Sequence, residues 1–153
     1  MVVGKILDFI KQKRGYDYPV SYKLLNGIPL SEDELYVNDY LMLRDSNIKR
    51  IPDGFYITGS LDLNNSKIKH LPDNLYVGGY LDLRKTNLKK LPNNMDVGSL
   101  YISDTEIDSI PEELFISSKF FVKNTPLGMK YTKEEIKKMI TDRNGHIGGD
   151  IIM

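Results

Sequence analysis

Apolar and polar residues alternate along this chain in a pattern that returns every 20 residues over most of its length. In one copy the alternating apolar pairs are Leu75/Val77 and Leu81/Leu83. Alternation with a period of two is typical of β-strands that bury one face. One more apolar residue follows the second pair, and another precedes a proline. The pattern predicts two short strands per copy, with their apolar side chains directed into a shared interior.

The number of repeat copies sets the number of coils that we expect in the fold. Five copies can be aligned, over residues 28–50, 51–70, 71–90, 91–109 and 110–130. The fourth copy lacks one residue near Gly98–Ser99. A single copy is too small to bury its own apolar side chains, whereas stacked copies bury them against one another. We therefore expect a solenoid of about five coils.

Two recurring residue types mark the corners of the expected coils. Proline returns at positions 52, 72, 92 and 111, and proline suits a corner where no backbone N–H is needed for pairing. A column of hydroxyl residues marks a turn, and such hydroxyls commonly satisfy turn backbone groups. No catalytic partner for this column is apparent, so we interpret it as structural. Its members are Ser46, Ser66, Thr86, Thr105 and Thr125.

The segment LPDNLYVGGYLDLRKTNLKKLP, residues 71–92, resembles the short glycine-containing leucine-rich repeats of proteins from bacteriophages and some bacteria. The resemblance covers residues 28–130. It implies an α/β leucine-rich-repeat solenoid that is curved, carries a ladder of short parallel strands on one face, and binds other proteins. The Asn of the best-known repeats is replaced by the hydroxyl column, so the turn is a variant. Effector ligases of similar repeat rhythm use a nucleophilic Cys, and this chain has none, which excludes that activity.

The residue patterns on either side of the repeat array predict a helix at each end. Residues 2–13 place apolar side chains on one helical face. Thr132 and Glu135 form a capping box that opens a second helix, and the final HIGGDIIM is either a strand or a loose tail. A membrane or calmodulin-type role is the alternative for the basic N-terminal helix. Because a solenoid needs closed ends, we expect one domain over 1–153, with an N-terminal helical cap over 1–27, leucine-rich repeats over 28–131, and a C-terminal helical cap and tail over 132–153.

The outward residues of the second strand of each coil form the surface on which we expect a partner to bind. Adjacent strands lie about 4.8 Å apart, so equivalent residues of successive coils are neighbours. Tyr80, Tyr101 and Phe121 should then form one aromatic patch, and Tyr, Phe, Met and Arg are enriched at binding hot spots. The candidate partner-binding residues are Tyr40, Met42, Arg44, Asp62, Tyr80, Asp82, Arg84, Tyr101, Lys119, Phe121 and Lys123.

The exposed residues also allow other interpretations. The aromatic patch could stack the bases of a nucleotide or single-stranded nucleic acid, with phosphates on nearby Arg and Lys side chains. The neighbouring carboxylates of Asp62 and Asp82 are a candidate acid–base pair, although no further acid, His or Asn completes a pocket. An imperfectly capped end could pair with another copy of the chain. A second outward column is either a structural ladder or a second binding face: Tyr36, Tyr56, Tyr76, Asp96 and Phe115.

The amino-acid composition of the chain argues against several classes of function. The 21 positive and 21 negative side chains cancel, which argues against a dedicated nucleic-acid binder. Without Cys, and with His70 and His146 as the two histidines, we expect neither a metal nor a cofactor. No apolar run reaches the ~20 residues of a membrane span. We therefore expect a non-catalytic, cytoplasmic protein-binding module with no membrane contact. The phage resemblance implies, by analogy, an inhibitor that occludes a host protein of an antiviral defence such as CRISPR–Cas.

Overall fold

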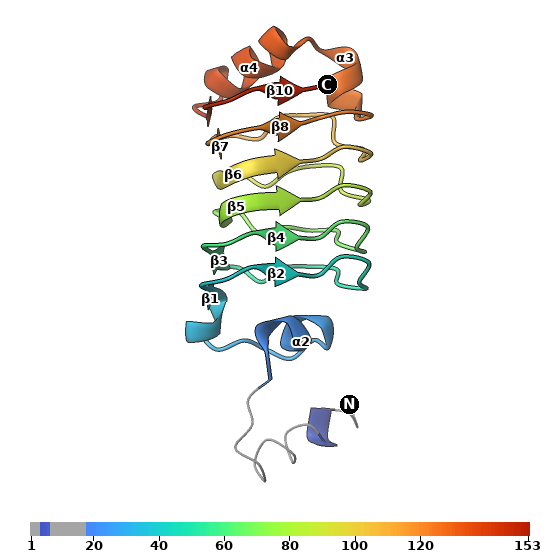
Figure 1. The fold of residues 1–153 in the computed structure, drawn as a ribbon, viewed down its shortest axis with the longest axis vertical. Helices are drawn as coiled ribbons and strands as arrows, with labels where there is room; N and C mark the ends of the chain where they lie inside the picture. The colour runs from blue at the N-terminus through green and yellow to red at the C-terminus, as the bar shows by residue number, and fades with distance from the viewer. Residues whose placement is uncertain (1–3, 7–17) are drawn as a thin grey trace.

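The computed structural model describes residues 4–6 and 18–153, and in it the repeats stack into a solenoid of parallel strands (Figure 1). The strands form two columns. One holds β1 (Tyr36–Val37), β3 (Tyr56–Ile57), β7 (Leu114–Ile116) and β9 (His146–Ile147). The other holds β2 (Leu41–Met42), β4 (Leu61–Asp62), β8 (Phe120–Phe121) and β10 (Ile151–Ile152). The longer strands β5 (Tyr76–Asp82) and β6 (Met95–Tyr101) run through both columns. The repeat-solenoid shape predicted from the periodicity is confirmed.

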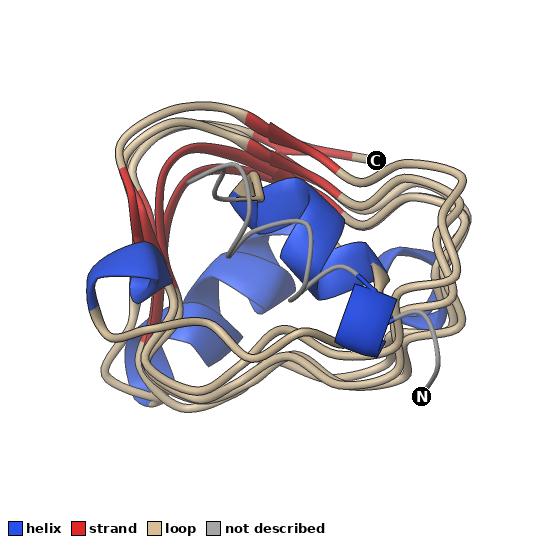
Figure 2. Cartoon of the chain, turned by 90° about the horizontal axis from the view of Figure 1, so that it is seen from below, coloured by secondary structure: helices blue, strands red, loops and turns tan. Residues whose placement is uncertain are grey.

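The core lies inside the coils. Viewed along the stack, strands occupy two adjoining sides of each coil, and loops close the rest (Figure 2). The inward apolar positions expected from the sequence are buried, and only Leu35, Val37 and Leu71 are half-buried. Among the described residues, Phe55 and Phe120 are the largest fully buried side chains. Because each buried side chain of this size contributes about 1.5–3 kcal/mol, the stacked core is the main source of stability.

The two strand columns meet at a corner built from glycines. Gly98 stacks on this corner so closely that a Cβ there would lie 2.4 Å from the carbonyl oxygen of Gly79. The pairing of β5 with β6 shifts register between Val77 and Tyr80. This shift is where the residue missing from the fourth copy is absorbed, so the two columns stay aligned above and below it.

The hydroxyl column has the structural role expected of it. The Thr86 hydroxyl donates to the carbonyl oxygen of Leu83 at 2.7 Å, and Thr105 does the same to Ile102 at 2.7 Å. Such bonds satisfy carbonyl groups at a turn that has no strand partner. The turn is thereby fixed in the same geometry in successive coils.

Next to the hydroxyl turn, one residue per coil adopts a left-handed backbone. The φ angles there are 54° at Asn65, 57° at Lys85 and 60° at Asp104. Asn and Asp tolerate this conformation, whereas other residues with a Cβ pay a steric penalty. Lys85 is therefore the strained member of this column, a feature that the sequence pattern did not reveal.

We predict that Lys85→Asn stabilises the protein by about 1 kcal/mol, because it relieves this steric penalty. Thermal unfolding of the variant and the wild type measures the change. Lys67→Asn is the matched control, since it removes the same charge from an exposed residue. A melting temperature raised equally by both substitutions would contradict the backbone explanation.

Helices lie at both ends of the described solenoid (Figure 1). The N-terminal end has α2 (Val20–Leu25) and the 3₁₀ helix η1 (Asp33–Leu35), neither of which was predicted. Of the helix predicted over 2–13, residues 4–6 are helical and the rest lies outside the described residues. The described helices include none with the length and apolar character to cross a membrane.

The C-terminal end holds α3 (Pro126–Lys130) and α4 (Lys133–Asp142). The predicted capping box opens α4, with the Thr132 hydroxyl accepting from the Glu135 N–H and the Glu135 carboxylate accepting from the Thr132 N–H. Ile136 and Ile140 are buried beneath this helix. The following HIGGDIIM is not a loose tail, because it forms β9 and β10, which pair with β7 and β8.

Candidate functional site

Four aromatic rings form a continuous row across the second strand column, which we call the aromatic row: Tyr40, Tyr80, Tyr101 and Phe121. Tyr40 and Tyr80 meet edge to face at 6.0 Å between centroids, Tyr80 and Tyr101 at 5.9 Å, and Tyr101 stacks on Phe121 at 4.3 Å. The Tyr80 hydroxyl also donates to the Tyr40 oxygen at 2.8 Å. The structure therefore brings together the patch expected from the sequence and extends it with Tyr40.

The aromatic row runs obliquely along the stack, because its rings come from two different outward positions of the second strand in each coil. Tyr40 and Tyr80 occupy the first outward position, just before β2 and within β5, and Tyr101 and Phe121 occupy the second, in β6 and β8. The residue between the first two rings is Ser60, which is too small to separate them. Ser60 also accepts the Tyr80 N–H at 3.0 Å.

Asp62 is buried beneath this surface. Its side chain is 0% exposed, and it accepts hydrogen bonds from Arg44 Nε at 2.8 Å and from the Asn64 N–H at 3.0 Å. A second guanidinium nitrogen of Arg44 lies 2.7 Å from the same carboxylate. The Arg44 side chain is half exposed, so the guanidinium covers the carboxylate and faces outward.

Asp82 repeats the arrangement in the next coil. It is 2% exposed and accepts from Arg84 Nε at 2.9 Å and from the Arg84 N–H at 3.0 Å. The Arg84 guanidinium carbon lies 5.4 Å from the centre of the Tyr101 ring, a cation–π distance. Arg84 thus links a buried carboxylate to the aromatic row.

The two carboxylates therefore do not line the surface as the sequence predicted. Alternation places their Cβ atoms on the outward side, but an arginine two residues away, or in the preceding coil, folds over each carboxylate. Asp62 and Asp82 instead hold the guanidinium groups of Arg44 and Arg84 in place at the surface. Neither carboxylate is accessible for the acid–base role considered above.

Arg44, Arg84 and Tyr40 each keep one charge state over the ordinary pH range. Hydrogen bonds to Asp62 and Asp82 raise the pKa of Arg44 and Arg84 further above its usual value. The hydrogen bond with Tyr80 is the main cause that raises the pKa of Tyr40, and burial adds to it. The site therefore presents uncharged Tyr40 and permanent guanidinium groups. Arg44, Tyr80, Asp82, Arg84 and Tyr101 enclose a small hollow of about 150 Å³.

The remaining candidates lie at the two ends of the row. Met42, on β2, is 58% exposed and lies two residues before Arg44 in the chain. Lys119 and Lys123 are exposed on either side of β8, and Phe121 between them is half-buried. The surface therefore has an apolar and guanidinium end, an aromatic centre and a lysine end.

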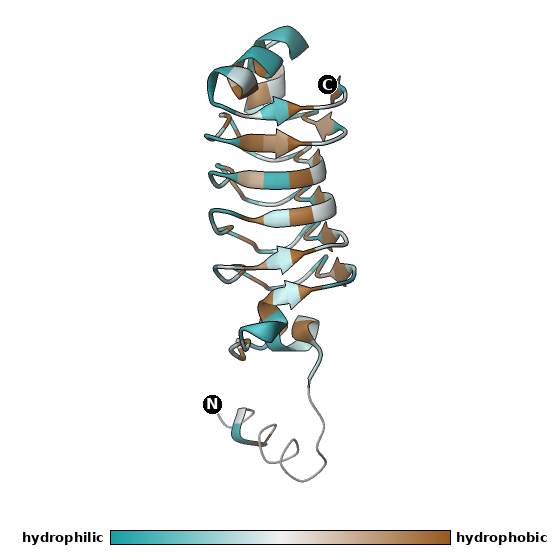
Figure 3. Cartoon of the chain, turned by 90° about the vertical axis from the view of Figure 1, so that its left-hand side faces the viewer, coloured by the Kyte–Doolittle hydropathy of each residue, from teal (hydrophilic) through white to brown (hydrophobic). Residues whose placement is uncertain are grey.

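The first strand column faces the viewer in Figure 3. It carries a second set of stacked rings. Tyr56 stacks on Tyr36 at 5.2 Å and on Tyr76 at 4.1 Å, with interplanar angles of 9° and 7°. Burial is the main cause that raises the pKa of Tyr56. The faces of these rings pack against one another, which is the geometry expected of a structural ladder.

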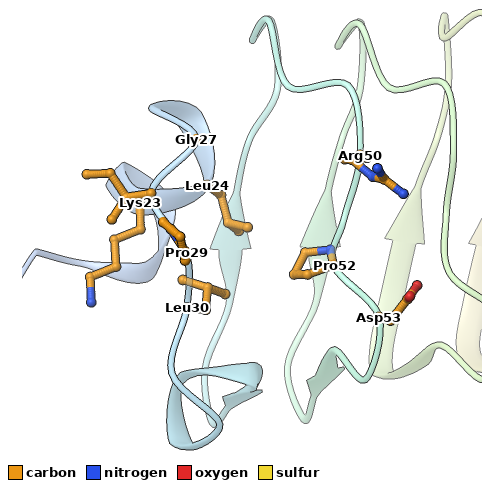
Figure 4. A pocket seen from close by; sticks show the side chains of 9 residues that line it. Lys23, Leu24, Gly27, Pro29, Leu30, Arg50, Pro52 and Asp53 are labelled. Carbon is orange, nitrogen blue, oxygen red and sulfur yellow. The ribbon is translucent and has the colours of Figure 1, made fainter. Parts of the chain in front are cut away.

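A cleft at the N-terminal end was not predicted, because it depends on where α2 lies. It has a volume of about 420 Å³. Figure 4 shows Leu24 and Leu30 on the N-terminal side and Pro52 on the facing coil. Lys23, which also lines it, is buried and ion-paired with Glu34.

No cluster of His, Asp or Glu with an arrangement suited to metal binding occurs over residues 4–6 and 18–153. Comparisons with protein-family models, with curated proteins and with solved structures find no match for this chain. The geometry of its own surfaces is therefore the basis for a functional proposal.

Proposed function

We propose that this chain is a leucine-rich-repeat module of about five coils, closed by a cap at each end, that binds another protein through its second strand column. The observation that supports the proposal is the aromatic row, flanked by Arg44 and Arg84 on buried aspartates. Its role is binding and not catalysis, and it needs no cofactor.

The geometry suits binding because the side chains are already ordered. Immobilising a free side chain costs about 0.5–1.5 kcal/mol on association. Arg44 and Arg84 are held by Asp62 and Asp82, and the rings are held by one another, so this cost is largely met within the free protein. Tyr and Arg are also the residue types that dominate interface energies.

Capture from a bacterial lysate tests this proposal. Wild-type protein and the variants Tyr80→Ala/Tyr101→Ala and Tyr36→Ala/Tyr56→Ala are immobilised in parallel, and bound proteins are identified. We expect one partner to be retained by the wild type and by the first-column variant. We expect at least about 30-fold weaker binding by the second-column variant, since truncating a hot-spot residue typically costs about 2 kcal/mol or more.

The paired variants make the result decisive because each removes two tyrosines from a different column. A partner lost from the Tyr36→Ala/Tyr56→Ala variant alone would move the site to the first column. A partner retained by both variants would place it on a cap or a loop. Capture of no protein would overturn the binding role.

The resemblance to phage repeats supports a narrower proposal for the partner. The chain would act in the bacterial cytoplasm as a phage-encoded inhibitor that occludes a host protein of antiviral defence, such as a CRISPR–Cas component. A captured housekeeping protein, without any defence component, would argue against this narrower form.

A further inference from the structure

A second surface lies away from both strand columns, on the segment that runs from the hydroxyl turn to the proline corner. Three successive coils place exposed basic residues on this segment. Stacking makes them neighbours across coils, since Arg50 and His70 form a parallel bridge and the Lys69 N–H donates to the Lys49 carbonyl oxygen at 2.9 Å. We call this set the basic stripe: Lys49, Arg50, Lys67, Lys69, His70, Lys89 and Lys90.

A groove of about 480 Å³ is sunk into the stripe. Its rim includes Lys69, Lys89 and Lys90, while Leu71 and Leu91 contribute an apolar lining. Leu71 is half-buried although its position in the repeat is an inward one. The groove thus combines cationic edges with an apolar floor.

The positive charge of the stripe is almost uncompensated. Lys89 lies 3.5 Å from Glu106, but both side chains are largely exposed, and such pairs contribute little. Within the described part of the chain, the lysines at 49, 67, 69 and 90 and Arg50 form no ion pair. The stripe therefore attracts an anionic partner.

The stripe ends abruptly at the next coil. There Glu106 and Asp108 occupy the positions that Lys67 and Lys69 occupy two coils earlier. Three coils spaced by about 4.8 Å span about 10 Å, which is the length of about three residues of extended peptide. The surface is thus matched to a short anionic segment and not to a long one.

We propose that this groove binds a short, extended acidic segment of a protein, with an apolar side chain on Leu71 and Leu91 and carboxylates on the surrounding lysines. A nucleic acid fits the groove less well. Among the described residues, its lining holds no Phe, Tyr or Trp, and His70 is the single aromatic ring there, so successive bases find no row of rings to stack on. A phosphate backbone continuing along the stack would also meet Glu106 and Asp108.

Fluorescence anisotropy with a labelled peptide tests the proposal on the full chain. The probe is fluorescein-Gly-Glu-Asp-Leu-Glu-Asp-Gly, titrated at low and at physiological salt. We expect saturable binding that weakens with salt, because exposed charges are screened over about 10 Å at 0.1 M. A peptide with Ser in place of Leu should bind about tenfold more weakly, since it leaves the apolar floor unfilled.

Two charge-matched variants assign the site. Lys69→Glu/Lys90→Glu reverses two charges at the groove, and Lys119→Glu/Lys123→Glu reverses two on the aromatic-row surface. We expect the first to weaken peptide binding at least about tenfold and the second to change it less than about twofold. Circular dichroism confirms that both variants fold, which is expected because all four lysines are exposed.

Several outcomes would overturn the proposal. They are the absence of peptide binding to the wild type, equal loss in both variants, and equal affinity for the Leu and Ser peptides. Tighter binding of a 12-nucleotide oligothymidylate than of the peptide, weakened by Lys69→Glu/Lys90→Glu but not by Lys119→Glu/Lys123→Glu, would assign the groove to phosphates instead. The proposed function is tested separately, by partner capture with the tyrosine variants, so this proposal can fail while the proposed function stands.

Discussion

Gly98→Ala is expected to destabilise the solenoid by about 3 kcal/mol, because the added methyl group meets backbone and not a movable side chain. A Cβ at this residue would lie 2.4 Å from the Gly79 carbonyl oxygen and 2.7 Å from that of Gly78. Relief requires the fourth coil to move away from the third, which separates the strand pairing on both sides of the corner. The backbone φ of Gly98 is not in the left-handed region, so the cost is steric.

Thermal unfolding followed by circular dichroism measures this effect. For a domain of this size, 3 kcal/mol corresponds to a fall in melting temperature of about 6–12 °C. Gly4→Ala is the matched control, because a Cβ there meets no atom within 4 Å. A melting temperature that falls by the same small amount in both variants would show that the corner has more room than the structure indicates.

Asp62→Ala is expected to cost about 3 kcal/mol as well, because it removes a buried carboxylate that accepts several hydrogen bonds. The substitution leaves the Asn64 N–H without its acceptor and leaves Arg44 without its anchor. It also opens a space beneath the surface, since Asp62 is fully buried. Binding of the partner should weaken too, because a released Arg44 must be ordered again on association.

Urea unfolding and partner capture are the two measurements for this prediction. Asp53→Ala serves as the control, since it removes a carboxylate that is exposed. Asp62→Asn keeps the shape of the side chain and an acceptor for Asn64, so its loss of stability should be smaller than that of Asp62→Ala. Equal stability of the wild type and Asp62→Ala would contradict an anchoring role.

The sequence predicts the interior of this protein well because one rule acts at every level of the stack. An apolar position that recurs in every coil is buried in most of them, so Leu61, Leu81 and Leu100, which occupy equivalent positions, all support the same prediction. The capping box of α4 is predictable for a similar reason, since its two hydrogen bonds depend on residues only three positions apart.

The surface is predicted less well because the direction of a Cβ does not determine where a side chain ends. Asp62 and Asp82 begin on the outward side, yet a long arginine can cover a short carboxylate completely. α2 was missed because its six residues are too few to show a helical periodicity. The strands of HIGGDIIM could have been recognised, since this segment aligns with YVGGYLDL of the third repeat.

The glycine corner has a consequence for how such a protein changes over evolution. The fourth coil is one residue shorter than the third, and the shift between Val77 and Tyr80 absorbs the difference without disturbing either strand column. A one-residue deletion is therefore accommodated at this corner, while duplication of a whole repeat adds a level to the ladder. Lineages can lengthen or shorten the stack and so reposition binding residues without redesigning the interior.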